Sequence, residues 1–475
     1  MATNDITLKY TEQLRAAKLN NESIQIIEFF GLNPNIQEKQ YKNFVDVMTA
    51  SPKLVDVFNE AVNSKQIKNL TLLDDDPNAG GRYNPSKQTI DIPLRILNFD
   101  KNTQIGSKYY YNSIFVMGHE TQHALNHKAF THKAWGEYWG KITKESEQHD
   151  SIRNYGQHLG NYIATYRKDE ASAQITGFNV IVSALQKENK DLTAEALIKT
   201  TRRMEDFIVP ENRQTQTKAR FREHYQFNLK NSFELNENNP FLEQLGQSKQ
   251  ALLNLEISAR NYFDKKAQDA QLGCHGNSDY TNKYITMALA YAIDLDKSKH
   301  KTPFPMDMDG FKVPRIAKLN EQESDYVVLP LSEKIIEENG LNIRAKNSVP
   351  YIDKTSGKTG TFEHTECIPL NPSANKSSTT SSSITASKEQ ISPKSNAMAR
   401  LEALTAKWDK AISAYESGDE AAIRASNQEM LQNPAIERMQ QGAAKLHEQD
   451  YAQQQAEYER MQQQQQVQSI GGRTR

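Results

Sequence analysis

The chain has 475 residues, which is long enough for two or three domains and a large buried core. Its 58 Lys and Arg balance 59 Asp and Glu, so no bulk electrostatic field attracts nucleic acid or an anionic membrane. The two cysteines, Cys274 and Cys367, support neither a disulfide scaffold nor a thiolate zinc site, although a single bridge stays open as an alternative.

The amino terminus gives an expectation about localisation. Residues 1–20 lack a basic start followed by an apolar run, so we expect no Sec signal peptide. No stretch of the sequence is long and apolar enough to predict a membrane span. A cytoplasmic enzyme has these properties, and so has a protein that a dedicated machine exports without a cleavable signal.

Residues 1–70 repeat apolar side chains at helical spacing and predict an N-terminal helical lobe. A second region, 71–190, begins with a glycine-containing turn that ends at Arg82 and Tyr83. Residues 88–94 then alternate apolar and polar side chains as an edge strand does, and Pro93 suits an edge rather than a central strand. A plain hairpin is the alternative.

A His-Glu-x-x-His pattern follows at His119, Glu120 and His123. On a helix the two histidines lie one turn apart on one face, so a single metal ion can bind both. Glu120 lies about 100° round the helix, close enough to take a proton from water but rotated away from ligation. The pattern predicts zinc-dependent hydrolysis, on a helix whose N-cap is Asn112 or Ser113. An ordinary amphipathic helix with exposed histidines is the alternative.

A catalytic zinc needs a third protein ligand and one open position for water. His127 lies two turns beyond His119, about 12 Å along the helix axis, and is too distant to share the same metal. The third ligand must therefore come from another helix. Gly118, next to the first histidine, would let another backbone come close.

Glu170 is the candidate for the third ligand. It shares a predicted helix face with the small residues Ala173 and Gly177, which would let its helix pack tightly against the first. Asp169 is its competitor as a ligand. The alternative for Glu170 is an ordinary carboxylate on a helix surface.

With this pattern the chain resembles the zincin metallopeptidases, and specifically the gluzincin arrangement of HExxH plus a glutamate on a downstream helix. The resemblance implies that His119, His123 and Glu170 bind Zn²⁺ and that Glu120 is the general base. It implies an α+β fold, mainly helical, with a small antiparallel sheet whose edge strand pairs with extended substrate and has Arg82 or Tyr83 near its rim. We therefore expect 71–190 to be the catalytic core.

The chain departs from the gluzincin pattern on the second helix. That pattern usually reads Asn-Glu with an Asp four residues after the Glu, whereas here Asp169 precedes Glu170 and Gln174 stands at the later place. The family pattern therefore does not identify the partner of the first histidine.

Residues 191–372 predict a mostly helical second lobe or accessory region. Within it, a glycine-bounded loop at 272–284 leads into an apolar helix. Zincins commonly place a Tyr or His opposite the zinc to stabilise the oxyanion, so the resemblance makes His275, Tyr280 and Tyr284 catalytic candidates. Helix packing for Tyr284 and a simple loop position for His275 are the alternatives.

The composition changes after residue 372. Residues 373–395 are dominated by Ser and Thr and predict a linker. Residues 396–475 predict a C-terminal helical module with a Gln-rich tail. We interpret the module as a docking segment for a secretion machine or chaperone, with coiled-coil oligomerisation as the alternative.

Residues 75–185 also resemble metallopeptidase toxins that bacteria export against other cells. We therefore expect an effector made in the bacterial cytoplasm and exported into a target cell by a dedicated secretion system. Its substrate would be a protein or the peptide stem of the cell wall, and a cognate immunity protein is a further expected partner. A housekeeping cytosolic metallopeptidase and a non-catalytic, zinc-stabilised binding protein are the alternatives.

Overall fold

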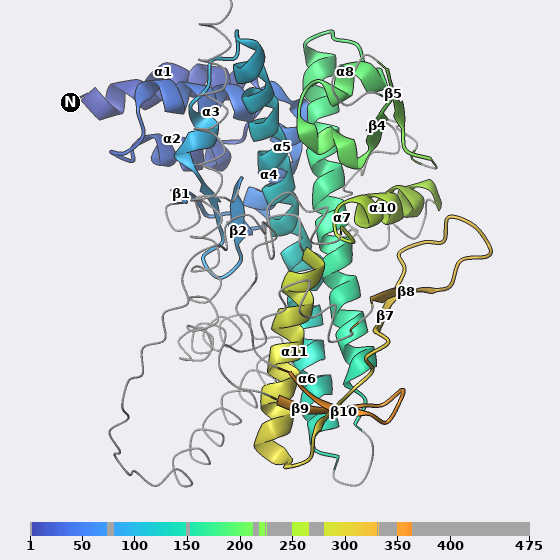
Figure 1. The fold of residues 1–475 in the computed structure, drawn as a ribbon. Coiled ribbons are helices and arrows are strands. Elements are labelled where there is room, and N and C mark those ends of the chain that lie inside the picture. The colour runs from blue at the N-terminus through green and yellow to red at the C-terminus, as the bar shows by residue number, and fades with distance from the viewer. Residues whose placement is uncertain are drawn as a thin grey trace, which may run out of the picture. The chain divides into compact units, whose positions relative to one another are not determined.

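The computed structural model describes residues 2–73, 80–148, 153–211, 218–223, 225, 249–265, 280–329, 331 and 349–362. They all belong to the first of two units into which the chain divides, Met1–Leu370 and Asn371–Arg475. The predicted linker, the predicted C-terminal module and His275 lie outside the described residues. The described part combines many helices with small sheets, so the α+β class is confirmed at this coarse level (Figure 1).

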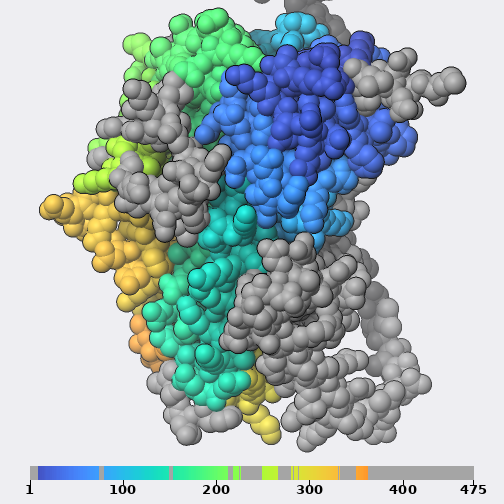
Figure 2. Space-filling view, turned by 180° about the vertical axis from the view of Figure 1, so that it is seen from behind, coloured from blue at the N-terminus to red at the C-terminus, as the bar shows by residue number. Residues whose placement is uncertain are grey.

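The first part of the chain is helical, as the apolar spacing predicts. Its helices are α1 (Ala2–Ala16), α2 (Asn21–Gly31), α3 (Glu38–Ala50) and α4 (Pro52–Asn63). The side chain of Asn20 caps α2 by accepting from the backbone N–H of Ser23, and Ser51 caps α4 in the same way. Apolar side chains from all four helices join the main core. Figure 2 shows these helices in blue, gathered at one end of the described surface.

A small mixed sheet precedes the central helices. Its strands are β1 (Asn69–Leu72), β2 (Arg82–Asn84) and β3 (Thr89–Ile92), in the order β1-β3-β2. The prediction of an antiparallel sheet is wrong, because β3 pairs with β1 in parallel and with β2 in antiparallel fashion. The prediction of an edge strand at 88–94 is also wrong, because β3 is central and fully buried. Pro93 follows the last paired residue, Ile92, and so removes no ladder hydrogen bond.

Helix α5 (Gln104–Asn126) contains the HExxH pattern. Its N-cap is Thr103, whose side chain accepts from the backbone N–H of Gly106. The prediction of an N-cap at Asn112 or Ser113 is wrong, because both residues lie inside the helix. The hydroxyl of Ser113 donates to the carbonyl of Ile96 at 2.7 Å, so its polarity serves a tertiary contact and not a helix start. The short 3₁₀ helix η1 (Leu94–Leu97) contains that carbonyl.

The chain leaves α5 through a π-helical turn, η2 (His127–Thr131), continues as α6 (His132–Ser146), and returns in the long helix α7 (Tyr155–Lys187). Helices α5 and α7 lie side by side at the centre of the described part (Figure 1). A Cβ added at Gly118 would lie 2.7 Å from the side chain of Val180, and one at Gly177 would lie 2.5 Å from the ring of Phe115. The predicted close packing at these two glycines is confirmed.

The rest of the described chain follows α7 in sequence. It comprises α8 (Ala194–Ile198), η3 (Arg202–Asp206), β4 (Ile208–Pro210), β5 (Ala219–Phe221), α10 (Lys249–Asn261), α11 (Tyr280–Lys299), β6 (Phe304–Met306), β7 (Phe311–Pro314), β8 (Tyr326–Leu329), β9 (Val349–Asp353) and β10 (Thr359–Phe362). The strands pair as β4-β5, β7-β8 and β10-β9-β6. The expectation of a mostly helical region missed these short strands. Among the described residues, no helix has the length and apolarity that crossing a membrane requires.

The contact between α5 and α7 can be tested by adding one methyl group. We expect Gly177→Ala to lower the free energy of unfolding by about 1–3 kcal/mol, because the new Cβ must displace the Phe115 ring. In Gly136→Ala, on α6, the new Cβ has no described atom within 4 Å, so we expect about 0.5–1 kcal/mol of stabilisation from helix propensity. Urea unfolding of the full chain measures both; shifts of equal sign and size would contradict the packing account.

Candidate metal centre

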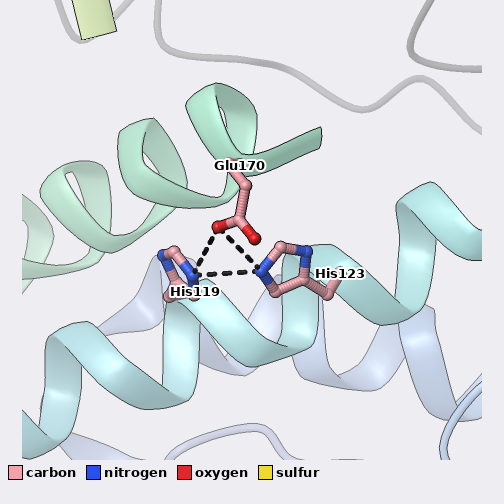
Figure 3. Close-up of side chains that lie close together, drawn as sticks. All are labelled: His119, His123 and Glu170. Atoms are coloured by element: carbon pink, nitrogen blue, oxygen red, sulfur yellow. Dashed lines mark hydrogen bonds and ion pairs between the residues drawn. The ribbon is translucent and has the colours of Figure 1, made fainter. Parts of the chain in front are cut away.

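Three predicted ligands from two helices meet between α5 and α7. The Nε2 atoms of His119 and His123 are 3.0 Å apart, and Oε2 of Glu170 lies 3.6 Å from each of them (Figure 3). One ligand atom from each residue lies within 4.8 Å of the other two. The structure therefore brings together the two histidines of α5 and the glutamate of α7 that the spacing predicts.

The three residues fit a zinc ion. Oε2 of Glu170 is buried and has no hydrogen-bond partner among the described residues. Ligand atoms about 2.0–2.2 Å from a tetrahedral zinc lie about 3.3–3.6 Å from one another, which is close to the spacing seen here. Two imidazole nitrogens and one carboxylate oxygen form a donor set of catalytic zinc sites, in which a fourth position stays open. A cation would also satisfy the buried oxygen that hydrogen bonding leaves unpaired.

Charge within the cluster supports the same interpretation. Burial lowers the pKa of His123, but the carboxylates of Asp169 and Glu170 outweigh burial and hold that pKa well above its ordinary value. Burial raises the pKa of Glu170, and His123 and His119 outweigh it, so that pKa lies far below its ordinary range. The two acids therefore stabilise positive charge between the helices, which is the charge that a bound divalent cation supplies.

Asp169 lies behind His123 and not in the ligand cluster. Its Oδ1 is 3.0 Å from Nδ1 of the imidazole, the ring nitrogen that faces away from Glu170. A carboxylate in this position orients a ligating histidine and raises its basicity. The structure thus separates the two adjacent acids of α7, with Glu170 as the ligand candidate and Asp169 as the partner of the second histidine.

His119, the first histidine of the pattern, is held by aromatic rings. Nδ1 of His119 is buried and has no hydrogen-bond partner within the part of the chain that the structure describes. Its ring stacks on Phe115, with centroids 6.3 Å apart, and meets the ring of Tyr262 edge-on at 5.9 Å. Gln174, at the place where gluzincins usually have the Asp, donates instead to Asp206 at 2.5 Å. The chain thus lacks the Asp of the gluzincin pattern at this place, and aromatic packing positions His119 instead.

Glu120 is buried beside the cluster and does not belong to the ligand group. Its Oε2 accepts a hydrogen bond of 2.9 Å from the backbone N–H of Tyr83, in β2. A Cβ added at Gly81 would lie 3.1 Å from Cγ of Glu120, so the chain before β2 passes directly over this side chain. Of the two residues predicted at the rim, Tyr83 thus contacts Glu120 through its backbone, whereas Arg82 pairs with Asp91 at 2.9 Å.

Tyr280 and Tyr284, at the start of α11, have different hydrogen-bond partners. The hydroxyl of Tyr284 donates to Oε1 of Glu170 at 3.0 Å, so its proton is engaged with a ligand carboxylate. The hydroxyl of Tyr280 lies 2.9 Å from that of Tyr262, whose ring contacts His119. Tyr262 was missed from the sequence, because a tyrosine at the end of an ordinary amphipathic helix gives no signal of a site. His275 cannot be placed, since it lies outside the described residues.

His127 lies apart from the cluster, as its spacing predicts. Its ring is 5.1 Å from that of His132 and 6.1 Å from that of Tyr83, measured between centroids. Burial, together with the nearby His132, lowers the pKa of His127 to about 4. This histidine is therefore neutral in the folded protein at any pH well above 4.

Comparison of the chain with protein-family models, with curated proteins and with solved structures gave no match. The functional argument for this protein therefore depends on the residues of the site and on their geometry.

The bond between Tyr284 and Glu170 gives a first test of the centre. We expect Tyr284→Phe to weaken zinc binding by about 10-fold or more, because the ligand carboxylate loses the donor that orients it. Tyr280→Phe, one turn earlier on the same helix, removes a hydroxyl that bonds Tyr262 instead, and should bind zinc like the wild type. Competition with a chromophoric chelator measures both affinities; equal losses would contradict the assignment.

The lowered pKa of His127 predicts a pH dependence of stability. Between pH 6.5 and 4 the unfolded chain protonates this histidine and the folded chain does not, so acidification favours unfolding. From pH 7 to pH 4 we expect the wild type to lose about 2–3 kcal/mol more than His127→Phe, which keeps an aromatic ring and cannot titrate. Urea unfolding at the two pH values measures this difference, and parallel losses in the two proteins would refute it.

Proposed function

We propose that the protein is a zinc-dependent metallopeptidase that hydrolyses an amide bond. One observation supports this most directly: His119, His123 and Glu170 converge from two helices, while Glu120 stands beside them outside the ligand group. A purely structural zinc site usually has four protein ligands and needs no such carboxylate. Three ligands with an adjacent, unligated glutamate are the arrangement that metal-assisted hydrolysis requires.

His119, His123 and Glu170 would hold the zinc, which supplies polarisation of the substrate carbonyl and acidification of the attacking water. Glu120 takes the proton of that water as general base and delivers it to the leaving amide nitrogen. The backbone N–H of Tyr83 orients Glu120 for this transfer, because it holds one carboxylate oxygen and leaves the other available.

Stabilisation of the oxyanion belongs, in this proposal, to hydroxyl groups near the cluster. Tyr280 and Tyr262 share one hydrogen bond, so one of the two hydroxyl protons remains to be donated. Tyr284 is less suited to this role, since its proton already serves Glu170. His275 stays a candidate on the sequence resemblance alone.

The biological setting of the proposal comes from the sequence. Residues 75–185 resemble exported bacterial toxins, and a Ser/Thr-rich stretch separates 1–372 from the predicted C-terminal module. We infer an effector that a secretion machine or its chaperone recognises through that module and that a cognate immunity protein restrains. Its substrate would be a target protein or the peptide stem of the cell wall.

Glu120→Gln tests this proposal. We expect at least a 100-fold loss of activity with zinc content unchanged, because the amide cannot accept the proton of the attacking water. Glu137→Gln, an exposed position on α6, is the matched control and should behave like the wild type. Each variant is expressed in a bacterial host with and without a periplasmic signal, and growth is followed together with the zinc content of the purified protein.

We expect the wild type and Glu137→Gln to be toxic and Glu120→Gln to be harmless. The compartment in which toxicity occurs would distinguish a target protein from the peptide stem of the cell wall as substrate. Undiminished toxicity of Glu120→Gln would contradict catalysis. Harmlessness of all three proteins, with zinc bound, would favour a housekeeping peptidase or a zinc-stabilised binding protein.

A further inference from the structure

A chain of buried polar side chains runs behind His123, between α5 and α7. The hydroxyl of Thr176 donates to Oε1 of Gln122 at 2.8 Å, and Nε2 of Gln122 donates to Oδ1 of Asn126, also at 2.8 Å. Nδ2 of Asn126 then donates to Oδ1 of Asp169 at 2.7 Å, and that oxygen is 3.0 Å from Nδ1 of His123. Gln122, Asn126 and Thr176 are all buried.

We propose that Asn126, oriented by Gln122, is a positioning residue for the zinc centre: it holds Asp169 as an acceptor, which fixes His123 with its proton on Nδ1. This inference rests on the proposed function, because it concerns the affinity of the proposed zinc site. Among the described residues, the side-chain hydrogen bonds of Asn126 and Gln122 go to other partners than His119, His123 and Glu170. Their effect on the metal passes through Asp169 and the imidazole.

The direction of the hydrogen bonds supports the proposal. An ionised carboxylate only accepts, so the hydrogen bond between Asp169 and His123 requires a proton on Nδ1. Nε2 of His123, the atom that faces Glu170, is then the ring nitrogen left for binding a cation. A flipped Asn126 amide would set its oxygen against the carboxylate of Asp169, and Gln122 opposes this flip by donating to Oδ1.

A second contact of Asn126 fits the same orientation of its amide. Its second contact is with Oγ of Ser172, at 2.7 Å, and the Ser172 hydroxyl itself donates to the carbonyl of Asp169. Gln122, Asn126 and Ser172 are buried, and a buried amide without a partner is unfavourable. The printed hydrogen bonds thus pair the amides of Gln122 and Asn126, and they leave Nε2 of His123 as the ring nitrogen that can bind a cation.

His119 has no comparable network, since its Nδ1 lacks a partner among the residues described and its ring is held by aromatic contacts. Disruption at Asn126 should therefore act on one of the two histidines. Because zinc affinity depends on all three ligands together, a partial loss is expected and not abolition.

Zinc affinity of the full chain tests the inference. We expect Asn126→Leu and Gln122→Met each to bind zinc 10- to 100-fold more weakly than the wild type, as for other partners of ligating histidines. Ser113→Ala is the matched control: it removes a buried hydroxyl of α5 that bonds Ile96, outside the network, and should leave the affinity unchanged. Competition with a chromophoric chelator gives the affinities, and urea unfolding of the zinc-free proteins reports the stability of each.

Gln122→Met keeps the shape of its side chain, so it remains informative if Asn126→Leu does not fold. Affinities within twofold of the wild type in both variants would overturn the inference, and so would an equal loss in Ser113→Ala, which would indicate general loosening of α5. If the wild type itself bound no zinc, the proposed function would fail before this inference was reached. The two failures are thus distinguishable.

Discussion

The close contact between α5 and α7 is the constraint on which the rest of the site depends. The proposed ligands come from both helices, so the size of the cluster is set by the distance between the two backbones. Gly118 lies next to His119 and meets Val180, and Gly177 lies two turns beyond Glu170 and meets Phe115. A larger side chain at either glycine would separate the carboxylate from the imidazoles. Phe115 also stacks on His119, so the same contact orients one ligand.

A buried ion-pair network holds α10 to α7 one turn before the ligand glutamate. Arg167 is fully buried and donates to Glu256 at 2.7 and 3.1 Å and to Asp264 at 2.8 Å through both Nε and Nη2. Removal of one member of such a group would leave an uncompensated buried charge, so the network resists separation of the helices. Tyr262 lies between Glu256 and Asp264 in sequence, so the network also fixes the position of Tyr262. The ring of Tyr262 packs against His119. The fold thus supports one ligand by packing and the other by hydrogen bonding.

The sequence predicts well what depends on local spacing. The i, i+4 histidines and the small residues near Glu170 identify one face of each helix, and the structure places those faces together. The sequence does not predict what depends on tertiary contact. The central position of β3 is set by its pairing with β1, and neither the alternation of its residues nor Pro93 reveals it. The network through Asn126 and Gln122 is likewise invisible in sequence, because buried amides resemble exposed ones until their partners are known.

The difference between local spacing and tertiary contact also explains why the predicted start of α5 is wrong. Polar residues at 112 and 113 suggest a cap, yet Ser113 bonds the carbonyl of Ile96 across the fold, and α5 begins nine residues earlier, at Gln104. It also applies to Glu120, the proposed general base. The pattern predicts a carboxylate beside the proposed zinc, whereas the hydrogen bond of Glu120 to the backbone of Tyr83 follows from the packing of β2 on α5.

The central claim is that one zinc ion is held by His119, His123 and Glu170. Crystals of the zinc-loaded protein, with anomalous diffraction recorded on both sides of the zinc absorption edge, test it most directly. The account predicts one anomalous peak between α5 and α7, about 2.0–2.2 Å from both Nε2 atoms and from an oxygen of Glu170, with Glu120 and Asp169 unligated. A peak at other residues, ligation by Asp169, or no peak at this site would contradict it.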